Sequence, residues 1–325
     1  MTLHPAVAAV RRGVRGDLTD LSAGDTVVVA CSGGADSLAL LSATVFEAHK
    51  RGVRVVGATI DHGLQADSAE HAAHVVGQMA ALGVDETVSA RVRVEGIGSG
   101  PEAAARRARY AVLGQIADRM QAAVVLLGHT RDDQAETVLL GLTRGSGGRS
   151  LAGMRRGYDC YRRPLLDLSR DETITACQVE GIEFWTDPHN RDPGFTRVRV
   201  RERVLPVLEE ELGPGIAAAL ARTADLLRDD MEFLDSLADH TYAEVAVDGG
   251  LDVTILRERP RPVRTRVLRR AAVDAGALDA ELFHVHVTAM KQLLERRGAE
   301  IQLPGHVTAY RDGDLLRFRP TAVES

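Results

Sequence analysis

Short apolar runs and helical patterns alternate along the first half of the chain. Apolar, β-branched runs predict buried strands at residues 26–30, 53–59, 86–94 and 124–128. Helical periodicity predicts helices at residues 37–50, 67–82, 101–120 and 132–143. This alternation predicts parallel βαβ units with helices on both faces of one sheet. Ligands of such sheets bind at the carboxyl ends of the strands, so we expect the chemistry in the loops that follow them.

The pattern changes at Gly213-Pro214-Gly215. An amphipathic helix is predicted from residue 216 to about residue 240. Beyond it we expect a strand-like piece at 251–256, helices at 262–275 and 280–296, and three short strands. We therefore predict a doubly wound, mostly parallel α/β domain at residues 1–212, a linker helix at residues 213–240 and a small α+β domain at residues 241–325.

The strongest chemical signal lies between the first strand and the first helix. It is the heptad Cys31-Ser32-Gly33-Gly34-Ala35-Asp36-Ser37. Its glycines allow a sharp turn, and successive N–H groups at a helix N-terminus bind phosphate well. Asp36 would repel bare phosphate, so we expect it to hold a magnesium ion bound to phosphate. The alternative is an ordinary turn capped by Ser32. A Walker-type loop is excluded, because neither lysine of the chain follows a glycine.

Polar residues also follow the second and fourth strands. Asp61 and His62 come after the second strand, and His129, Asp132 and Asp133 come after the fourth. The two histidines could contact nucleotide phosphate or base, or be hydrogen-bonded structural residues. The two carboxylates at the helix start could equally be ordinary caps.

Two arginine-containing segments are further candidates. Arg106 and Arg109 lie three residues apart on one predicted helix face, where their guanidinium forks suit phosphate oxygens. On the residues alone, two solvated surface arginines are the favoured interpretation. The glycine-rich stretch at residues 144–149 could close over a substrate, or be a plain mobile connection.

Together these motifs resemble a known family. SGGADS at residues 32–37 is similar to the pyrophosphate-binding loop of the N-type ATP pyrophosphatases. With DHGL at 61–64, the E-x-x-A-R-x-x-R-Y pattern at 102–110, GHTRDDQAET at 128–137 and RGSG at 144–147, the chain resembles the tRNA(Ile)-lysidine synthetases. Two departures stand out: Gln65 replaces a usual basic residue, and Val198 replaces a usual asparagine. The short tail matches the compact form of the family, which has one C-terminal domain.

The resemblance implies an ATP-dependent ligase. Its substrates would be free L-lysine and the isoleucine tRNA with a CAU anticodon, whose wobble cytidine is adenylated on the C2 oxygen before the lysine amine displaces AMP. ATP and Mg²⁺ would be the cofactors, and since the family often dimerises, a homodimer is one expected assembly.

The same resemblance assigns roles to individual residues. Catalysis would fall to Asp36, Arg106, His129 and Asp133, of which Asp36 and Asp133 would also bind the metal. Nucleotide binding would fall to Ser32, Gly33, Gly34, Ala35, Asp36, Ser37, Asp61 and His62. Substrate binding would fall to Arg109, Asp132, Glu136, Arg144, Gly145, Ser146, Gly147, Arg197 and Arg201.

The net charge of −6 does not by itself indicate an RNA partner. Arginines nevertheless cluster at residues 155–163, 197–203 and 257–270. Each cluster could contact RNA phosphates or form salt-bridged helix faces.

The three cysteines form no CxxC pair, which indicates a reducing cytoplasm and argues against a tRNA thiolase. The N-terminus is expected to be a short amphipathic helix rather than a secretory signal, and no apolar run is long enough for a membrane span. A thiolase, an amidating synthetase and a catalytically silent nucleotide-binding protein remain the alternatives.

Overall fold

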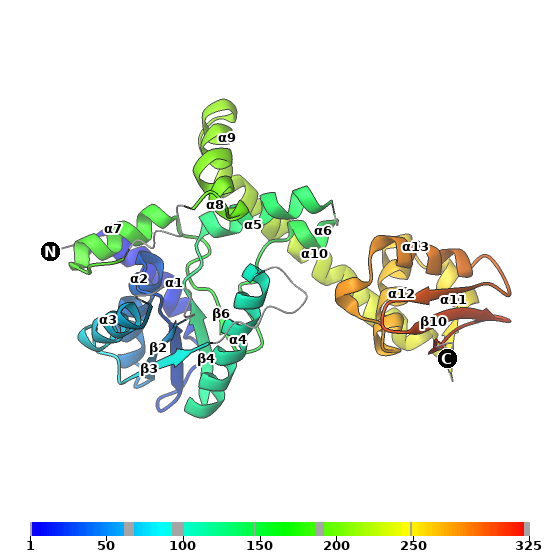
Figure 1. The fold of residues 1–325 in the computed structure, drawn as a ribbon, viewed down its shortest axis with the longest axis horizontal. Coiled ribbons are helices and arrows are strands. Elements are labelled where there is room, and N and C mark those ends of the chain that lie inside the picture. The colour runs from blue at the N-terminus through cyan, green and yellow to red at the C-terminus, as the bar shows by residue number, and fades with distance from the viewer. Residues whose placement is uncertain are drawn as a thin grey trace. The chain divides into compact units, whose positions relative to one another are not determined.

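The computed structural model describes residues 2–61, 68–92, 101–145, 147–185, 192–247 and 249–321. The chain forms two compact units (Figure 1). The first unit contains Met1–Arg144 and Gly153–Ala224, and the second contains Gly145–Ala152 and Asp225–Ser325. None of the described helices combines the length and the apolar character needed to cross a bilayer.

A six-stranded sheet organises the first unit, in the order β3-β2-β1-β4-β6-β5. Its strands are β1 (Thr26–Ala30), β2 (Arg54–Asp61), β3 (Glu86–Arg91), β4 (Ala122–Leu127), β5 (Gly157–Tyr158) and β6 (Tyr161–Arg162). All neighbours are parallel except the β5–β6 edge pair. The strand order reverses at β1, which is paired with β2 on one side and β4 on the other. In a doubly wound sheet, this reversal places a ligand crevice at the carboxyl end of β1.

Helices cover both faces of this sheet (Figure 1). They are α1 (Pro5–Asp17), α2 (Ala35–His49), α3 (Ser68–Ala81), α4 (Pro101–Met120) and α7 (Arg170–Glu180). The helix that follows β4, α5 (Arg131–Arg144), packs in a separate small core. Because successive strand side chains point to opposite faces, Val27 and Val29 pack with α1, α2, α3 and α7. Val28 packs on the other face, with Leu113 and Ile116 of α4. The predicted doubly wound α/β class is therefore confirmed.

A helical segment follows the sheet. It comprises α8 (Thr196–Arg199), the π-helix η2 (Val200–Val204), α9 (Leu205–Leu212) and the long helix α10 (Ile216–Val245). Val200 and Leu205 pack against Ala135 of α5, in a small separate core. This contact brings the arginines of α8 and η2 to the start of α5.

The second unit is a small α+β structure with its own core. Its elements are α6 (Gly148–Leu151), β7 (Ala246–Val247), β8 (Gly250–Asp252), α11 (Val253–Glu258), α12 (Arg261–Asp274), η3 (Asp279–Glu281), α13 (His284–Leu293), β9 (Glu300–Leu303), β10 (Val307–Asp312) and β11 (Leu315–Pro320). The sheet is antiparallel, in the order β7-β8-β11-β10-β9. Leu268 and Met290 are fully buried between its helices and sheet.

Three predictions differ from the structure. The strand predicted at 251–256 ends at Asp252, because this side chain accepts from the N–H groups of Thr254 and Ile255 and so starts α11. The helix predicted at 280–296 is a 3₁₀ turn followed by the shorter α13. The long helix extends to Val245, and the two units divide inside it rather than at its ends.

Candidate active site

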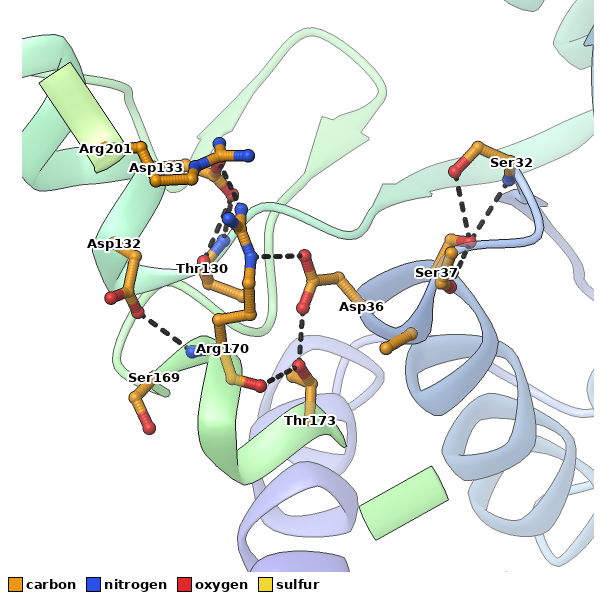
Figure 2. A network of polar contacts seen from close by, with 12 residues as sticks. Ser32, Asp36, Ser37, Thr130, Asp132, Asp133, Ser169, Arg170, Thr173 and Arg201 are labelled. Carbon is orange, nitrogen blue, oxygen red and sulfur yellow. Dashed lines mark hydrogen bonds and ion pairs between the residues drawn. The ribbon is translucent and has the colours of Figure 1, made fainter. Parts of the chain in front are cut away.

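The loop between β1 and α2 has the form that phosphate binding requires. Gly33 has φ +80°, and a Cβ atom there would lie 2.7 Å from Cγ2 of Val75. Ser37 bridges the turn, since its hydroxyl donates to the Gly34 carbonyl at 2.9 Å and accepts from the Ser32 N–H at 3.1 Å (Figure 2). The loop is therefore fixed in shape, and it leads directly into the N-terminus of α2.

Two residues that the sequence did not single out support this loop from outside. The backbone N–H of Trp185 donates to the Gly33 carbonyl at 2.9 Å. The His71 ring lies 3.2 Å, by its Nε2, from the Ser32 carbonyl and 4.0 Å from the Trp185 ring centre. Because these contacts join α3 and the segment after α7 to the loop, no local sequence pattern could have indicated them.

Asp36 and Asp133 converge on one guanidinium group. Arg170, at the start of α7, places its Nε 3.4 Å from Asp36 Oδ2 and its Nη2 3.1 Å from Asp133 Oδ1 (Figure 2). Asp36 also accepts a hydrogen bond from the Thr173 hydroxyl, one turn along α7. The two predicted metal ligands thus lie together, and Arg170 is a site residue that sequence reasoning missed.

The two carboxylates have different protonation behaviour. Burial raises the pKa of Asp36, and Arg170 and Thr173 only partly offset it. Burial also acts to raise the pKa of Asp133, but Arg170, His129 and the Thr130 N–H outweigh it, so this pKa is lowered. Asp133 is held ionised by hydrogen bonds from Thr130 N–H and Oγ1, at 2.9 and 3.1 Å.

His129 is a neutral imidazole at physiological pH. Burial, with the nearby positive charges of Arg163, Arg106 and Arg197, lowers the pKa of His129 to about 4. Within the described residues, its buried Nδ1 has no hydrogen-bond partner. A buried nitrogen without a partner is costly, so this atom is suited to a bound group.

The arginines of α4 lie among other cations. Arg106 and Arg109 are both exposed, as expected of surface arginines. The pKa of Arg109 is nevertheless lowered, by partial desolvation of its guanidinium group and by the positive charges of Arg106 and Arg197. Arg106 lies over the Tyr110 ring, and Arg163 donates to the Tyr110 hydroxyl at 3.1 Å. In the part of the chain that the structure describes, neither Arg106 nor Arg109 forms a salt bridge with a carboxylate. Uncompensated arginines close to one another favour an anionic ligand.

Glu136 and Arg201 form a buried ion pair. The Glu136 side chain is 0% exposed and accepts from Arg201 Nε and Nη2 at 2.6 and 3.0 Å. Arg197 lies farther away, with its Nε 3.8 Å from Glu136 and its Nη2 3.3 Å from the Thr137 hydroxyl. Val198, where the resemblance leads one to expect asparagine, is buried beside these arginines. The pair joins α5 to η2.

The remaining predicted residues have varied positions. Asp132 accepts from the Arg170 N–H at 2.8 Å, so it caps α7 rather than its own helix. Asp61 is buried at the end of β2, with Oδ2 3.5 Å from Arg91. Arg144 is the last residue of α5, whereas Gly145 and Gly147 belong to the second unit. The glycine-rich loop predicted at residues 144–149 is shorter than expected, because α6 begins at Gly148. His62 and Ser146 lie outside the described residues.

Comparison with known proteins gives the family. Residues 12–208 match the PP-loop domain family. The chain is 52% identical to the tRNA(Ile)-lysidine synthase of Thermobifida fusca, over 96% of this chain and 97% of that protein. It is 47% identical to the enzyme of that name from Streptomyces coelicolor, over 97% and 99%. The chain belongs to the tRNA(Ile)-lysidine synthase family.

A solved structure supports the fold of this family member. The U34-tRNA thiolase NcsA from Methanococcus maripaludis, solved with its [4Fe-4S] cluster, aligns with a TM-score of 0.57. The alignment covers 69% of this chain and 79% of that one, at 16% sequence identity. At this identity the likeness extends to the fold alone.

The acidic groups of this lysidine synthase family member fit a nucleotide-borne magnesium ion. Asp36 and Asp133 converge closely enough to share one cation, here the Arg170 guanidinium. Among the described residues, no group of three or more metal-binding side chains exists. Mg²⁺ commonly uses one or two carboxylates and completes its shell with phosphates and water. The pair therefore suits Mg²⁺ that arrives on a triphosphate.

The C-terminal arginine cluster of this family member is largely neutralised by its own unit. Its ion pairs are Arg257–Glu295, Arg259–Glu244, Arg266–Asp235, Arg269–Asp279 and Arg270–Asp239. Arg156 and Arg162 of the first unit pair similarly, with Asp167 and Asp20. Of the two interpretations of these clusters, the structure favours salt-bridged helix faces for these arginines.

Proposed function

We propose that this chain joins the ε-amine of L-lysine to C2 of the wobble cytidine in isoleucine tRNA with a CAU anticodon, consuming ATP and releasing AMP and pyrophosphate. The main support for this proposal is that the chain is 52% identical, over nearly its whole length, to a tRNA(Ile)-lysidine synthase. The convergence of the loop, two carboxylates and a neutral histidine on one sheet edge agrees with that chemistry.

The first step, adenylation of the cytidine, requires the triphosphate of ATP to be bound in a fixed position. The rigid loop at residues 32–37 donates backbone N–H groups to the β- and γ-phosphates, which leave together as pyrophosphate. Mg²⁺ held by Asp36 and Asp133 would offset the charge that develops on those phosphates. Arg106 and Arg109, which lack carboxylate partners among the described residues, supply fixed positive charge to the α-phosphate. Losing one such donor costs about 3 kcal/mol of transition-state stabilisation.

The second step requires a base. The cytidine C2 oxygen attacks the α-phosphorus, and this turns that oxygen into a leaving group. Lysine must then attack C2 as the neutral amine, and the C2–O bond breaks as AMP departs with its electron pair. Asp133, whose pKa is lowered, and His129, whose Nδ1 has no partner among the described residues, would be the candidates to receive the proton that the amine releases.

Nucleoside analysis tests this proposal. The full chain is incubated with ATP, Mg²⁺, lysine and a CAU-anticodon isoleucine tRNA, and the digested tRNA is examined by mass spectrometry. We expect one cytidine heavier by lysine less water, together with one AMP per modified tRNA. A methionine tRNA with the same anticodon should remain unmodified. Absence of the heavier nucleoside, with AMP released instead on addition of a sulfur donor or of deamido-NAD and ammonia, would refute the assignment.

A tRNA thiolase activity is the alternative that the motif at residues 32–37 leaves open. The cysteines argue against it. Cys31, Cys160 and Cys177 are all free, and burial raises the pKa of each thiol, for Cys177 to about 12. Protonated thiols are poor nucleophiles and poor cluster ligands.

We also propose that the protein is cytoplasmic and that it forms a homodimer. Light scattering of the purified chain tests whether it is a dimer.

A further inference from the structure

Arg170 occupies an unusual position for an arginine. It is the first residue of α7, where the helix dipole disfavours a cation. The helix start is nevertheless firmly held: Ser169 and Glu172 form a reciprocal capping box, and Asp132 accepts from the Arg170 N–H at 2.8 Å. A cation is thus fixed where its own helix does not favour it, which indicates that its stabilisation comes from partners outside α7.

Those partners are the two predicted metal ligands. The side chains of Asp36 and Asp133 are 20% and 10% exposed, and that of Arg170 is 26% exposed. Two carboxylates this close and this buried repel each other unless a cation lies between them. Arg201 also approaches Asp133, at 3.4 Å, but for Asp36 the structure shows only Arg170 and the Thr173 hydroxyl (Figure 2). Within the described ranges, Arg170 is therefore the one side chain that forms ion pairs with both carboxylates.

We propose that Arg170 is a positioning residue: a built-in counter-cation that holds Asp36 and Asp133 converged before nucleotide binds, and that yields its place on these carboxylates to the metal of MgATP. The inference rests on the proposed function, since it takes the two aspartates as metal ligands. It makes metal binding depend on nucleotide, because the metal must displace a charge already present.

Metal binding without nucleotide tests the idea. Mn²⁺ affinity is measured by electron paramagnetic resonance for the full wild-type chain and for Arg170→Ala, Arg170→Lys and Arg11→Ala. Arg11 is the matched control, because it forms a similarly buried pair with Glu180, at 2.7 Å, away from the two aspartates. We expect Arg170→Ala to bind Mn²⁺ roughly tenfold or more tightly, because the metal no longer competes with a unit charge beside both ligands. Arg170→Lys and Arg11→Ala should match the wild type.

Thermal melting in chelator gives a second readout. Arg170→Ala and Arg11→Ala should both melt below the wild type, but Mn²⁺ should restore only Arg170→Ala, and Asp36→Asn in that background should abolish the restoration. If Arg170→Ala fails to fold, Arg170→Met keeps the aliphatic stem for the same measurements. Unchanged Mn²⁺ affinity in the folded variant would overturn the inference. Mn²⁺ affinity and thermal melting do not depend on product formation. A wild-type chain that forms no lysidine would therefore refute the proposed function without deciding the role of Arg170.

Discussion

The Glu136–Arg201 pair offers a sharp test of how this site is held together. The resemblance assigns both residues to substrate, yet in the structure they bind each other at 2.6 and 3.0 Å across α5 and η2. If the pair joins these elements, replacing Glu136 with alanine should destabilise the first unit even when no substrate is present.

The expected magnitude follows from burial. Removing one partner of a buried ion pair costs about 3–5 kcal/mol, because the other charge is left unpaired. After Glu136→Ala, Arg201 still has Asp133 at 3.4 Å, so we expect about 3 kcal/mol, the lower end of that range. Arg201→Met leaves the fully buried Glu136 with Arg197, at 3.8 Å, as its remaining ion-pair partner among the described residues, and should cost about 5 kcal/mol, the upper end.

Urea unfolding followed by tryptophan fluorescence measures this cost. Trp185 is the only tryptophan of the chain and lies in the first unit, so its signal reports that unit. With a denaturant slope of about 1–3 kcal/mol per molar, a loss of about 3 kcal/mol lowers the urea midpoint by at least about 1 M.

A double variant supplies the control for this measurement. Glu136→Leu combined with Arg201→Met removes both charges and should cost much less than either charge removed alone. Single variants with unchanged midpoints, or a double variant whose cost equals the sum of the singles, would refute the structural role.

Three further outcomes are expected. Asp36→Ala should abolish AMP release while circular dichroism stays unchanged, and full activity would remove Asp36 from the mechanism. Because the folded-state pKa of His129 is about 4 and the unfolded value about 6.5, the unfolded chain binds more protons between these values. Stability should therefore fall as pH drops from about 6.5 towards 4, and His129→Asn should flatten that part of the profile in urea titrations. Reversing charge at Arg261 and Arg264, which form no carboxylate ion pair in the described part of α12, should weaken tRNA binding and reduce its salt dependence; equal affinity across a salt series would mean that they face away from RNA.

The sequence predicted those parts of the fold that local chemistry decides. Proline starts α4 at residue 101 as expected, and the continuous apolar, β-branched run at residues 26–30 gives the bounds of β1 without error. Residues 251–256 were assigned wrongly because a short apolar run cannot by itself distinguish a strand from a helix, and the cap at Asp252 decided for α11.

The site could be predicted only where its residues lie in motifs. Asp36 and Asp133 were found in this way, and their convergence follows from strand order. Arg170 was missed because its partners lie 134 and 37 residues away in the chain, so no spacing indicates the contact. His71 was missed for the same reason, since it meets Ser32 only after α3 packs on the sheet.

The distribution of charge explains why these scattered contacts matter for chemistry. Acidic side chains gather at the start of α5 and α2, and each has a cation from another segment: Arg170 for Asp36 and Asp133, and Arg201 for Glu136. Arg106 and Arg109 of α4 have no such carboxylate partner among the described residues, so the site is electrostatically incomplete on that side. A triphosphate would supply negative charge to these arginines, and its metal would take the place of Arg170 on the aspartates. We therefore expect MgATP to bind better than the metal alone, which would have to displace Arg170 from both carboxylates without bringing phosphate to the arginines.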